Sequence, residues 1–156
     1  MITIQIANLH PYLLIHEGKV CTFLNRIIDH YNWTSSGALS LAFMTKNDHS
    51  KLHGKFLNDF RPTDVITFPG DPENDLAGEI CVSVDQAVEM TKVSKLTFDQ
   101  ELSLYLIHGL LHLIGYDDQN INDRKIMKQE EVISMALVEK SSLWPDFHLA
   151  SNSHTN

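Results

Sequence analysis

The sequence contains few cysteines, glycines and prolines. It has two cysteines, seven glycines and five prolines among 156 residues, which excludes a disulfide-stapled scaffold and a collagen-like or other low-complexity chain. Cys21 and Cys81 lie far apart within apolar stretches. We therefore expect two buried thiols, rather than a disulfide or a zinc pair, and a reducing, cytoplasmic environment.

Long apolar runs and an excess of positive charge are also missing. No stretch approaches the roughly 18 consecutive apolar residues of a membrane span, and the first eight residues alternate without the pattern of a secretory signal. Lys and Arg number 12 against 20 Asp and Glu, for a formal net charge of −8. A protein that binds duplex DNA mainly through its overall charge normally has a positive net charge. We therefore expect neither a membrane nor DNA as a partner, while a local basic patch remains compatible with RNA.

The hydrophobic pattern predicts one α+β domain with a mixed sheet of about four strands packed with helices in three α/β/α layers. Strands are predicted at residues 2–6, 38–45, 65–68 and 79–84. Helices are predicted at residues 13–31, 47–57, 85–95, 98–113 and 122–139. The second strand is apolar on both faces, which is typical of a central strand. We expect the domain to span residues 1–140 and a C-terminal tail to follow at 141–156.

A candidate metal site lies in the predicted helix at residues 98–113. His108 and His112 are four residues apart, so their rings share one helix face and two imidazole nitrogens can reach one ion at about 2.0–2.1 Å. Gly115 is expected to end the helix with a positive φ. Asp118, or Asp117 beside it, can then supply a third ligand. Two His and one Asp leave a coordination position open for water, as catalytic sites do.

A pair of histidines with this spacing also occurs in ordinary core helices. Here the helix is almost wholly apolar, and burying two imidazoles costs free energy unless they are partnered, as a shared metal would do. Glu101 and Tyr105 lie on the same helical stripe and are candidate partners of the histidines, although core packing explains Tyr105 equally well. The zinc-peptidase motif His-Glu-x-x-His places a general base after its first His. Gly109 occupies that position, which argues against peptide hydrolysis by that route.

The segment from His108 to Asp118, His-Gly-Leu-Leu-His-Leu-Ile-Gly-Tyr-Asp-Asp, resembles the motif His-Gly-x-Leu-His-Leu-x-Gly-Tyr-Asp-His of the YbeY family of rRNA maturation endoribonucleases. Only the last fixed position differs. Two further family elements have counterparts in the same order, Pro62-Thr-Asp-Val-Ile-Thr-Phe-Pro69 and Gly78-Glu-Ile80. The resemblance covers roughly residues 1–140.

The resemblance implies a zincin-like fold and a single-strand-specific, metal-dependent endoribonuclease of the bacterial cytoplasm. Its implied role is rRNA maturation at the 3′ end of the small-subunit rRNA and ribosome quality control, with rRNA and the small ribosomal subunit or its proteins as partners. It also implies one divalent metal, in the first instance Zn²⁺, held by three histidines. Two map to His108 and His112, and the third maps to Asp118. Two His and one carboxylate also suit Fe(II), Mn and Ni, so Asp118 in place of the third histidine leaves more than one metal possible.

A second departure concerns the substrate side of the site. Family members carry an Arg shortly before the Pro-Thr element, and without gaps that position is Leu57 here. We predict that Arg61 and Lys55 bind substrate, within a phosphate-facing wall formed by residues 40–62, where Lys and Arg outnumber the acids. A metal-activated water would then attack a phosphodiester, with no catalytic residue assigned. Asp117 is expected to anchor the loop or accept a hydrogen bond. Two alternatives stay open, a metal-dependent hydrolase of another substrate and a non-catalytic ribosome-assembly factor.

Overall fold

The computed structural model describes residues 1–57 and 63–151. Its main sheet has the strand order β1-β3-β5-β4. These strands are β1 (Ile2–Asn8), β3 (Gly37–Met44), β5 (Leu76–Ser83) and β4 (Val65–Asp71). β1, β3 and β5 are parallel, whereas β4 runs antiparallel to β5 and forms one edge. The predicted mixed four-stranded sheet is confirmed, and β3 is a central strand as its apolar sequence indicated.

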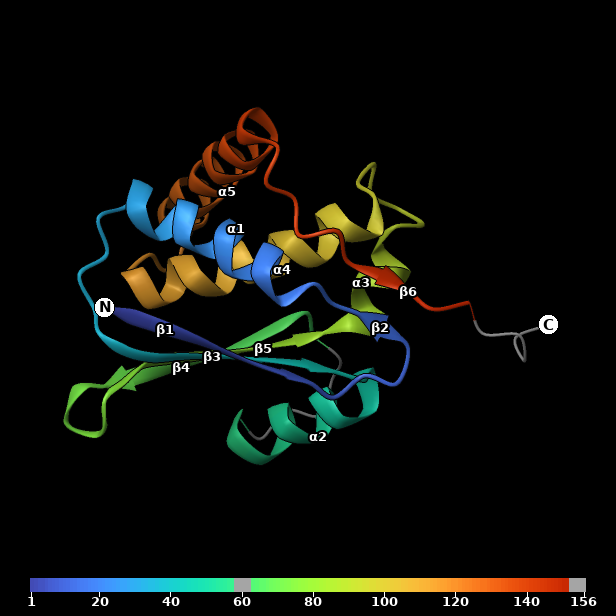
Figure 1. Ribbon diagram of the computed structural model, residues 1–156, viewed down its shortest axis with the longest axis horizontal. Coiled ribbons are helices and arrows are strands. Elements are labelled where there is room, and N and C mark those ends of the chain that lie inside the picture. Colours follow the sequence, from blue (N-terminus) through green and yellow to red (C-terminus); the bar gives the residue numbers. More distant parts are fainter. Residues whose placement is uncertain (58–62, 152–156) are drawn as a thin grey trace.

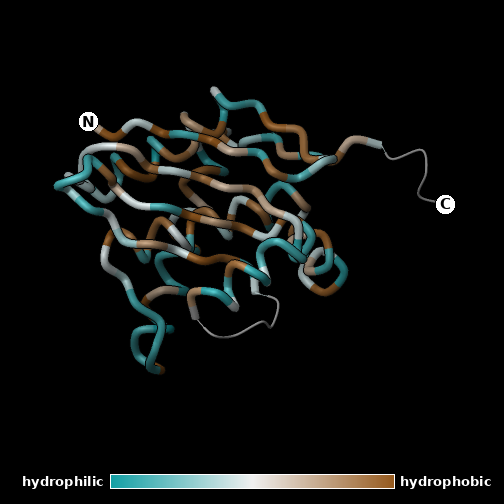
Figure 2. Tube along the Cα trace, turned by 90° about the horizontal axis from the view of Figure 1, so that it is seen from below, coloured by the Kyte–Doolittle hydropathy of each residue, from teal (hydrophilic) through white to brown (hydrophobic). Residues whose placement is uncertain are grey.

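Helices cover both faces of this sheet (Figure 1). α1 (Glu17–His30), α4 (Phe98–Ile114) and α5 (Ile121–Ser141) lie above it, and α2 (Lys46–Leu57) lies below it. A short helix, α3 (Val84–Met90), follows β5, and a 3₁₀ turn, η1 (Pro72–Asn74), links β4 to β5. The α+β fold class and its three-layer arrangement are therefore confirmed. In the view from below, hydrophobic residues recur along the strands of the sheet (Figure 2).

The core lies between the sheet and the upper helices. Side chains alternate along β3, where Leu39, Leu41 and Phe43 are buried. α4 is buried along most of its length, with Leu106 and Leu110 fully enclosed. This explains why α4 carries so many apolar residues on more than one side. No helix within residues 1–57 and 63–151 is long and apolar enough to cross a membrane.

Several element boundaries differ from the predicted ones. Leu13–Leu14 form strand β2 rather than the start of a helix, and α1 begins only after His16, whose side chain accepts the N–H of Lys19. α3 begins at Val84, one residue before the predicted start, and Ser83 caps it. α5 begins at Ile121 and is capped by Asn120.

The segment that follows α5 packs on the domain. β6 (His148–Leu149) pairs antiparallel with β2. Phe147 is 3% exposed, and its ring centroid lies 5.3 Å from that of Phe43. Within the segment predicted as a C-terminal tail, Phe147 thus belongs to the core and Leu143 and Trp144 pack against it.

Candidate metal centre

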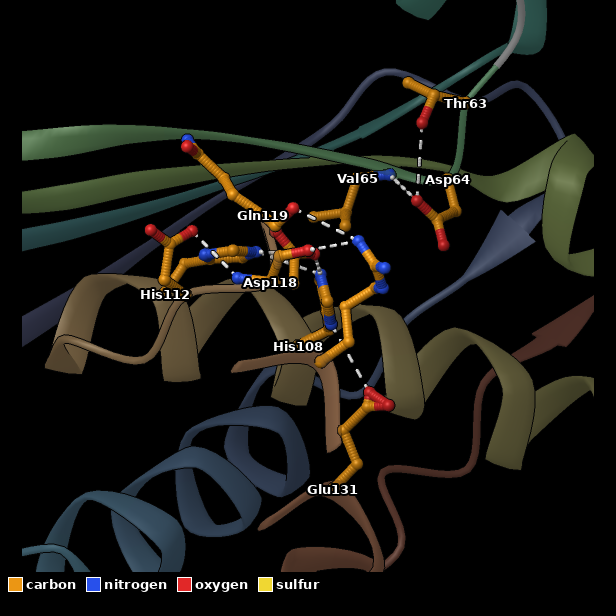
Figure 3. A network of polar contacts seen from close by, with 10 residues as sticks. Thr63, Asp64, Val65, His108, His112, Asp118, Gln119 and Glu131 are labelled. Atoms are coloured by element: carbon orange, nitrogen blue, oxygen red, sulfur yellow. Dashed lines mark hydrogen bonds and ion pairs between the residues drawn. The ribbon is translucent and has the colours of Figure 1, made fainter. Parts of the chain in front are cut away.

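The candidate metal centre lies at the C-terminal end of α4 (Figure 3). α4 starts with a capping box, in which the side chains of Thr97 and Gln100 each accept the other's backbone N–H. It ends at Gly115, which has φ 131°. This conformation favours glycine and turns the chain so that Asp118 comes back beside the two histidines. The structure thereby brings together His108, His112 and Asp118, the three predicted ligands.

The separations of the three ligand atoms test whether they fit one ion. Nε2 of His108 lies 3.0 Å from Nε2 of His112, and each nitrogen lies 3.3 Å from Oδ2 of Asp118. Ligands about 2.0–2.1 Å from a tetrahedral ion are about 3.3–3.4 Å apart. The three atoms therefore form one face of a coordination tetrahedron, with the fourth corner left for water or substrate. The residues fit a divalent ion, and the donor set of two imidazoles and one carboxylate is compatible with zinc.

Glu131 orients the first histidine. Nδ1 of His108 lies 3.3 Å from Oε2 of Glu131 on α5, so Nδ1–H donates to the carboxylate and the lone pair of Nε2 faces the other ligands. Burial lowers the pKa of His108, but the hydrogen bond and charge of Glu131, with the charges of Asp64 and Asp118, outweigh burial and raise it. The surroundings of this imidazole are thus negative and favour a cation.

The expected histidine partners on α4 itself, Glu101 and Tyr105, make no hydrogen bond to His108 or His112 within the described residues. Oε2 of Glu101 accepts a bond from the Ser94 hydroxyl, and the Tyr105 hydroxyl has no hydrogen-bond partner within the described part of the chain. The partner that the sequence reasoning missed, Glu131, is 23 residues from His108 on another helix. No local spacing in the sequence links these two positions.

The loop that carries Asp118 is held from two sides. Oδ1 of Asp117 accepts the N–H of Asp118 at 2.8 Å, so Asp117 anchors the loop. The Arg124 guanidinium donates to the carbonyl oxygens of Asp118, at 3.5 Å, and Gln119, at 3.2 Å. These contacts fix the backbone around the third ligand, whose side chain is shorter than that of a histidine.

The ligands face a cleft of about 570 Å³. One wall is the edge strand β4, which overlaps the Pro62–Pro69 element of the sequence. The other wall is α4 with the loop that follows it. Oδ1 of Asp64 accepts the backbone N–H of Val65 at 2.8 Å at the start of this wall. Phe56, from the end of α2, and Phe68, from β4, pack edge to face with ring centroids 5.2 Å apart, and both line the cleft.

Of the two predicted substrate-binding residues, only Lys55 lies within the described part of the chain. Lys55 is exposed on α2, and its Nζ lies 5.5 Å from the ring centroid of Phe56, so it sits next to a residue of the cleft wall. Arg61 lies outside the described residues. At the other end of α2, Lys46 pairs with Glu89 at 2.7 Å. Within the described residues, no lysine or arginine lines the cleft itself, and Lys55 adjoins it only through Phe56.

Gly109 explains why no glutamate follows the first metal-binding histidine. A Cβ at this position would lie 2.6 Å from Cγ2 of Ile80 and 3.2 Å from Cγ2 of both Thr67 and Val65. α4 therefore lies close against the sheet at Gly109, and this position faces β4 and β5. A larger side chain here would push the helix off the sheet.

The whole site and its order along the chain match a known family. The model of the family described as Endoribonuclease YbeY matches residues 13–139. The chain belongs to the YbeY family. Its motif differs from that of the family in carrying Asp118 at the position of the last histidine, and the group of His108, His112 and Asp118 fits a metal site with Asp in place of the third His.

Relatives named Endoribonuclease YbeY come from several bacteria. One from Protochlamydia amoebophila is 43% identical over 98 residues, which cover 60% of this chain and 65% of the relative. One from Carboxydothermus hydrogenoformans is 28% identical over 145 residues, covering 87% of this chain and 99% of the relative. One from Nautilia profundicola is 32% identical over 111 residues, covering 70% and 80%.

The fold is also that of a solved structure. The solution structure of TM1509 from Thermotoga maritima superposes with a TM-score of 0.62 and 23% sequence identity, over 99% of this chain and all of that one. This similarity shows that the α+β architecture is shared over essentially the full chain.

Proposed function

We propose that this YbeY-family chain is a divalent-metal-dependent endoribonuclease that cleaves single-stranded RNA, with Zn²⁺ as its resident ion. The observation that carries the proposal is the triangle of His108, His112 and Asp118 ligand atoms, 3.0–3.3 Å apart, at the wall of an open cleft. A three-ligand site with one open corner is typical of catalytic rather than structural metals. The relatives share the name Endoribonuclease YbeY, which supports hydrolysis of RNA as the reaction.

One set of residues in the site would bind the ion, and another would bind the RNA strand. When bound, the ion supplies an activated water and polarises a phosphoryl oxygen. His108, His112 and Asp118 hold it, and Glu131 keeps His108 in the tautomer that leaves Nε2 free to coordinate. The aromatic pair of Phe56 and Phe68 offers a face on which an unpaired base can stack.

The substrate is single-stranded rRNA, in the first instance the 3′ end of the small-subunit rRNA, processed during maturation and ribosome quality control. The net charge of −8 supports a presented substrate, because an acidic protein gains little affinity from the phosphate backbone alone. The small ribosomal subunit or its proteins would present the strand, and the protein would act in the cytoplasm, where ribosomes mature.

Cleavage of a defined RNA tests the proposal. The substrate is a single-stranded fragment with the sequence of the small-subunit rRNA 3′ end, and the matched control is the same fragment annealed to its complement. We expect the wild-type protein loaded with Zn²⁺ to cut only the single strand, EDTA to abolish cleavage and added Zn²⁺ to restore it. The variant His112→Ala should not cleave. Failure of the wild-type protein to cut any RNA with Zn²⁺, Mn²⁺, Fe²⁺ or Ni²⁺ would refute the proposal.

A further inference from the structure

The outer edge of strand β4 borders the metal cleft. β4 pairs with β5 on one side, and no other strand within the described residues pairs with it. Residues 63–69 line the cleft together with the three candidate ligands, and Figure 3 shows these ligands between α4 and the strand that starts at Val65. An edge strand presents N–H and C=O groups that its own sheet leaves unpaired. Such groups on β4 therefore lie within reach of whatever binds in the cleft.

The pairing of β4 with β5 decides which of its N–H groups point outward. The carbonyl oxygen of Asp64 accepts the N–H of Ser83 at 2.9 Å, so these two residues form a hydrogen-bonded pair of the antiparallel ladder. The main-chain groups of successive residues alternate between the two sides of a strand. Those of Ile66 and Phe68 therefore point toward β5, whereas those of residues 65, 67 and 69 point away from the sheet.

The three outward positions offer one free N–H between them. Residue 69 is proline, which has no N–H and is tolerated at such an edge position. The N–H of Val65 donates to Oδ1 of Asp64 at 2.8 Å. The N–H of Thr67 is thus left without a partner in the part of the chain that the structure describes.

Thr67 lies opposite the metal-binding histidines. Its Cγ2 is 3.2 Å from the position that a Cβ would take at Gly109, the residue that follows His108. Thr67 also lines both the cleft and a neighbouring cavity of about 350 Å³, and His112 lines the same two spaces. The free N–H is therefore at the level of the two histidines, on the facing wall of the cleft.

Cleavage of a phosphodiester makes use of such a donor. Negative charge develops on the nonbridging oxygens of the phosphate, and a preorganised main-chain N–H stabilises charge of this kind. Among the described residues, no lysine or arginine lines the cleft. The Thr63 hydroxyl on the same wall already donates to Asp64, at 3.4 Å. The N–H of Thr67 is held in place by the sheet, so it needs no rearrangement to meet a phosphate oxygen.

We propose that the main-chain N–H of Thr67 donates to a nonbridging oxygen of the phosphate that is cleaved. The inference rests on the proposed function and assigns a phosphate-binding group to it. The contact orients the phosphate toward the open corner of the triangle formed by His108, His112 and Asp118. It also stabilises the charge that develops on the phosphate oxygens during cleavage.

The first test follows this N–H in the wild-type protein and requires no cleavage. Dimethyl phosphate, a diester with the same single charge as an RNA linkage, is titrated into the Zn²⁺-loaded protein while backbone amide signals are recorded by NMR. The Thr67 amide proton should shift downfield, because it gains an anionic acceptor. The amide protons of Ile66 and Phe68, which point toward β5, should shift much less. Shifts confined to residues 108–118, or no shifts at all, would overturn the proposal.

The second test removes the N–H. Thr67→Pro deletes it without breaking a ladder bond, and Thr67→Val keeps it while deleting the hydroxyl. The single-turnover rate of cleavage of the single-stranded RNA fragment should fall about 100-fold in Thr67→Pro, as is typical for the loss of one such donor, while the Zn²⁺ content stays unchanged. The rate should fall far less in Thr67→Val. An equal loss in both variants would overturn the proposal, because the hydroxyl would then be the donor.

The matched control is Glu17→Pro. It removes a main-chain N–H at the first residue of α1, a position where proline is tolerated, and should cleave at the wild-type rate. A wild-type rate in Thr67→Pro would overturn the proposal. If dimethyl phosphate shifts the Thr67 amide proton but no RNA is cleaved, the phosphate contact is supported and the proposed nuclease activity is refuted. The NMR titration uses the wild-type protein, so it remains decisive if Thr67→Pro does not fold.

Discussion

Nδ1 of His108 on α4 lies 3.3 Å from Oε2 of Glu131 on α5, so a carboxylate 23 residues further along the chain orients the imidazole. This contact joins the metal centre to the packing of two helices. A shift of α5 against α4 would turn the ring and misplace Nε2. The geometry of the site therefore depends on the helical layer as well as on the His-x-x-x-His spacing.

The variant Glu131→Gln should weaken metal binding. Glutamine removes the negative charge and one of the two acceptor oxygens, and its NH₂ group can face His108 instead, so the tautomer and orientation of His108 are less firmly fixed; such outer partners typically contribute 10- to 100-fold in metal affinity. We expect the dissociation constant for Zn²⁺, measured by competition with a chromophoric chelator, to rise about 10- to 100-fold. Glu73→Gln, at an exposed position in η1, should leave it unchanged. An unaltered affinity in Glu131→Gln would show that His108 needs no external orientation.

Asp118 should be required for stoichiometric metal binding. Its Oδ2 is equidistant, at 3.3 Å, from the coordinating nitrogens of both histidines, so Asp118→Ala removes one of three ligands. Elemental analysis after gel filtration should find well below one ion per chain in Asp118→Ala. Asp118→His, which restores the histidine of the family motif, should retain close to one ion. Full metal content in the alanine variant would show that Asp118 is not a ligand.

The parts of the structure that the sequence predicts are those that local patterns determine. The alternation in β1 and the glycine turn at Gly115 each depend on residues within a few positions, and the structure contains both. Glu131 and the packing of Phe147 against Phe43 depend on contacts between distant segments. Neither leaves a period or spacing in the sequence, so only the folded chain shows them.

Gly109→Ala should destabilise the protein even though alanine favours helices. The new Cβ would lie 2.6 Å from Cγ2 of Ile80, and overpacking of this kind costs about 1–3 kcal/mol. The gain in helix propensity, about 1 kcal/mol, offsets only part of that cost. We expect a net loss of up to about 2 kcal/mol in the free energy of unfolding, measured by urea denaturation.

Gly18→Ala is the matched control for this substitution. Gly18 lies in α1, where an added Cβ meets only the His16 side chain, at 3.3 Å. Without a collision with the sheet, the helix propensity of alanine should dominate and leave the free energy of unfolding unchanged or slightly higher. Equal effects in the two variants would contradict the close approach of α4 to the sheet at Gly109.

His49 should make the protein less stable as the pH falls below neutrality. The side chain is fully buried in α2, and its Nε2–H donates to the carbonyl oxygen of Cys81 at 2.9 Å. Burial lowers the pKa of His49 below its ordinary value of 6.5, although the Cys81 carbonyl and the charge of Asp64 oppose the shift, and His53 adds to it. Below pH 6.5 the unfolded chain therefore takes up a proton that the folded chain does not, and the free energy of unfolding decreases.

The variant His49→Gln isolates this contribution. The stability of the wild-type protein minus that of His49→Gln, from urea denaturation at pH 5.5–8.5, should be constant above pH 7.5. Below pH 6.5 it should fall by about 1 kcal/mol per pH unit, since one proton per molecule corresponds to about 1.4 kcal/mol per unit. The fall should cease once the pH drops below the pKa of His49 in the folded state. A difference that does not change with pH would show that His49 binds its proton equally well in both states, so that burial in α2 does not disfavour the imidazolium.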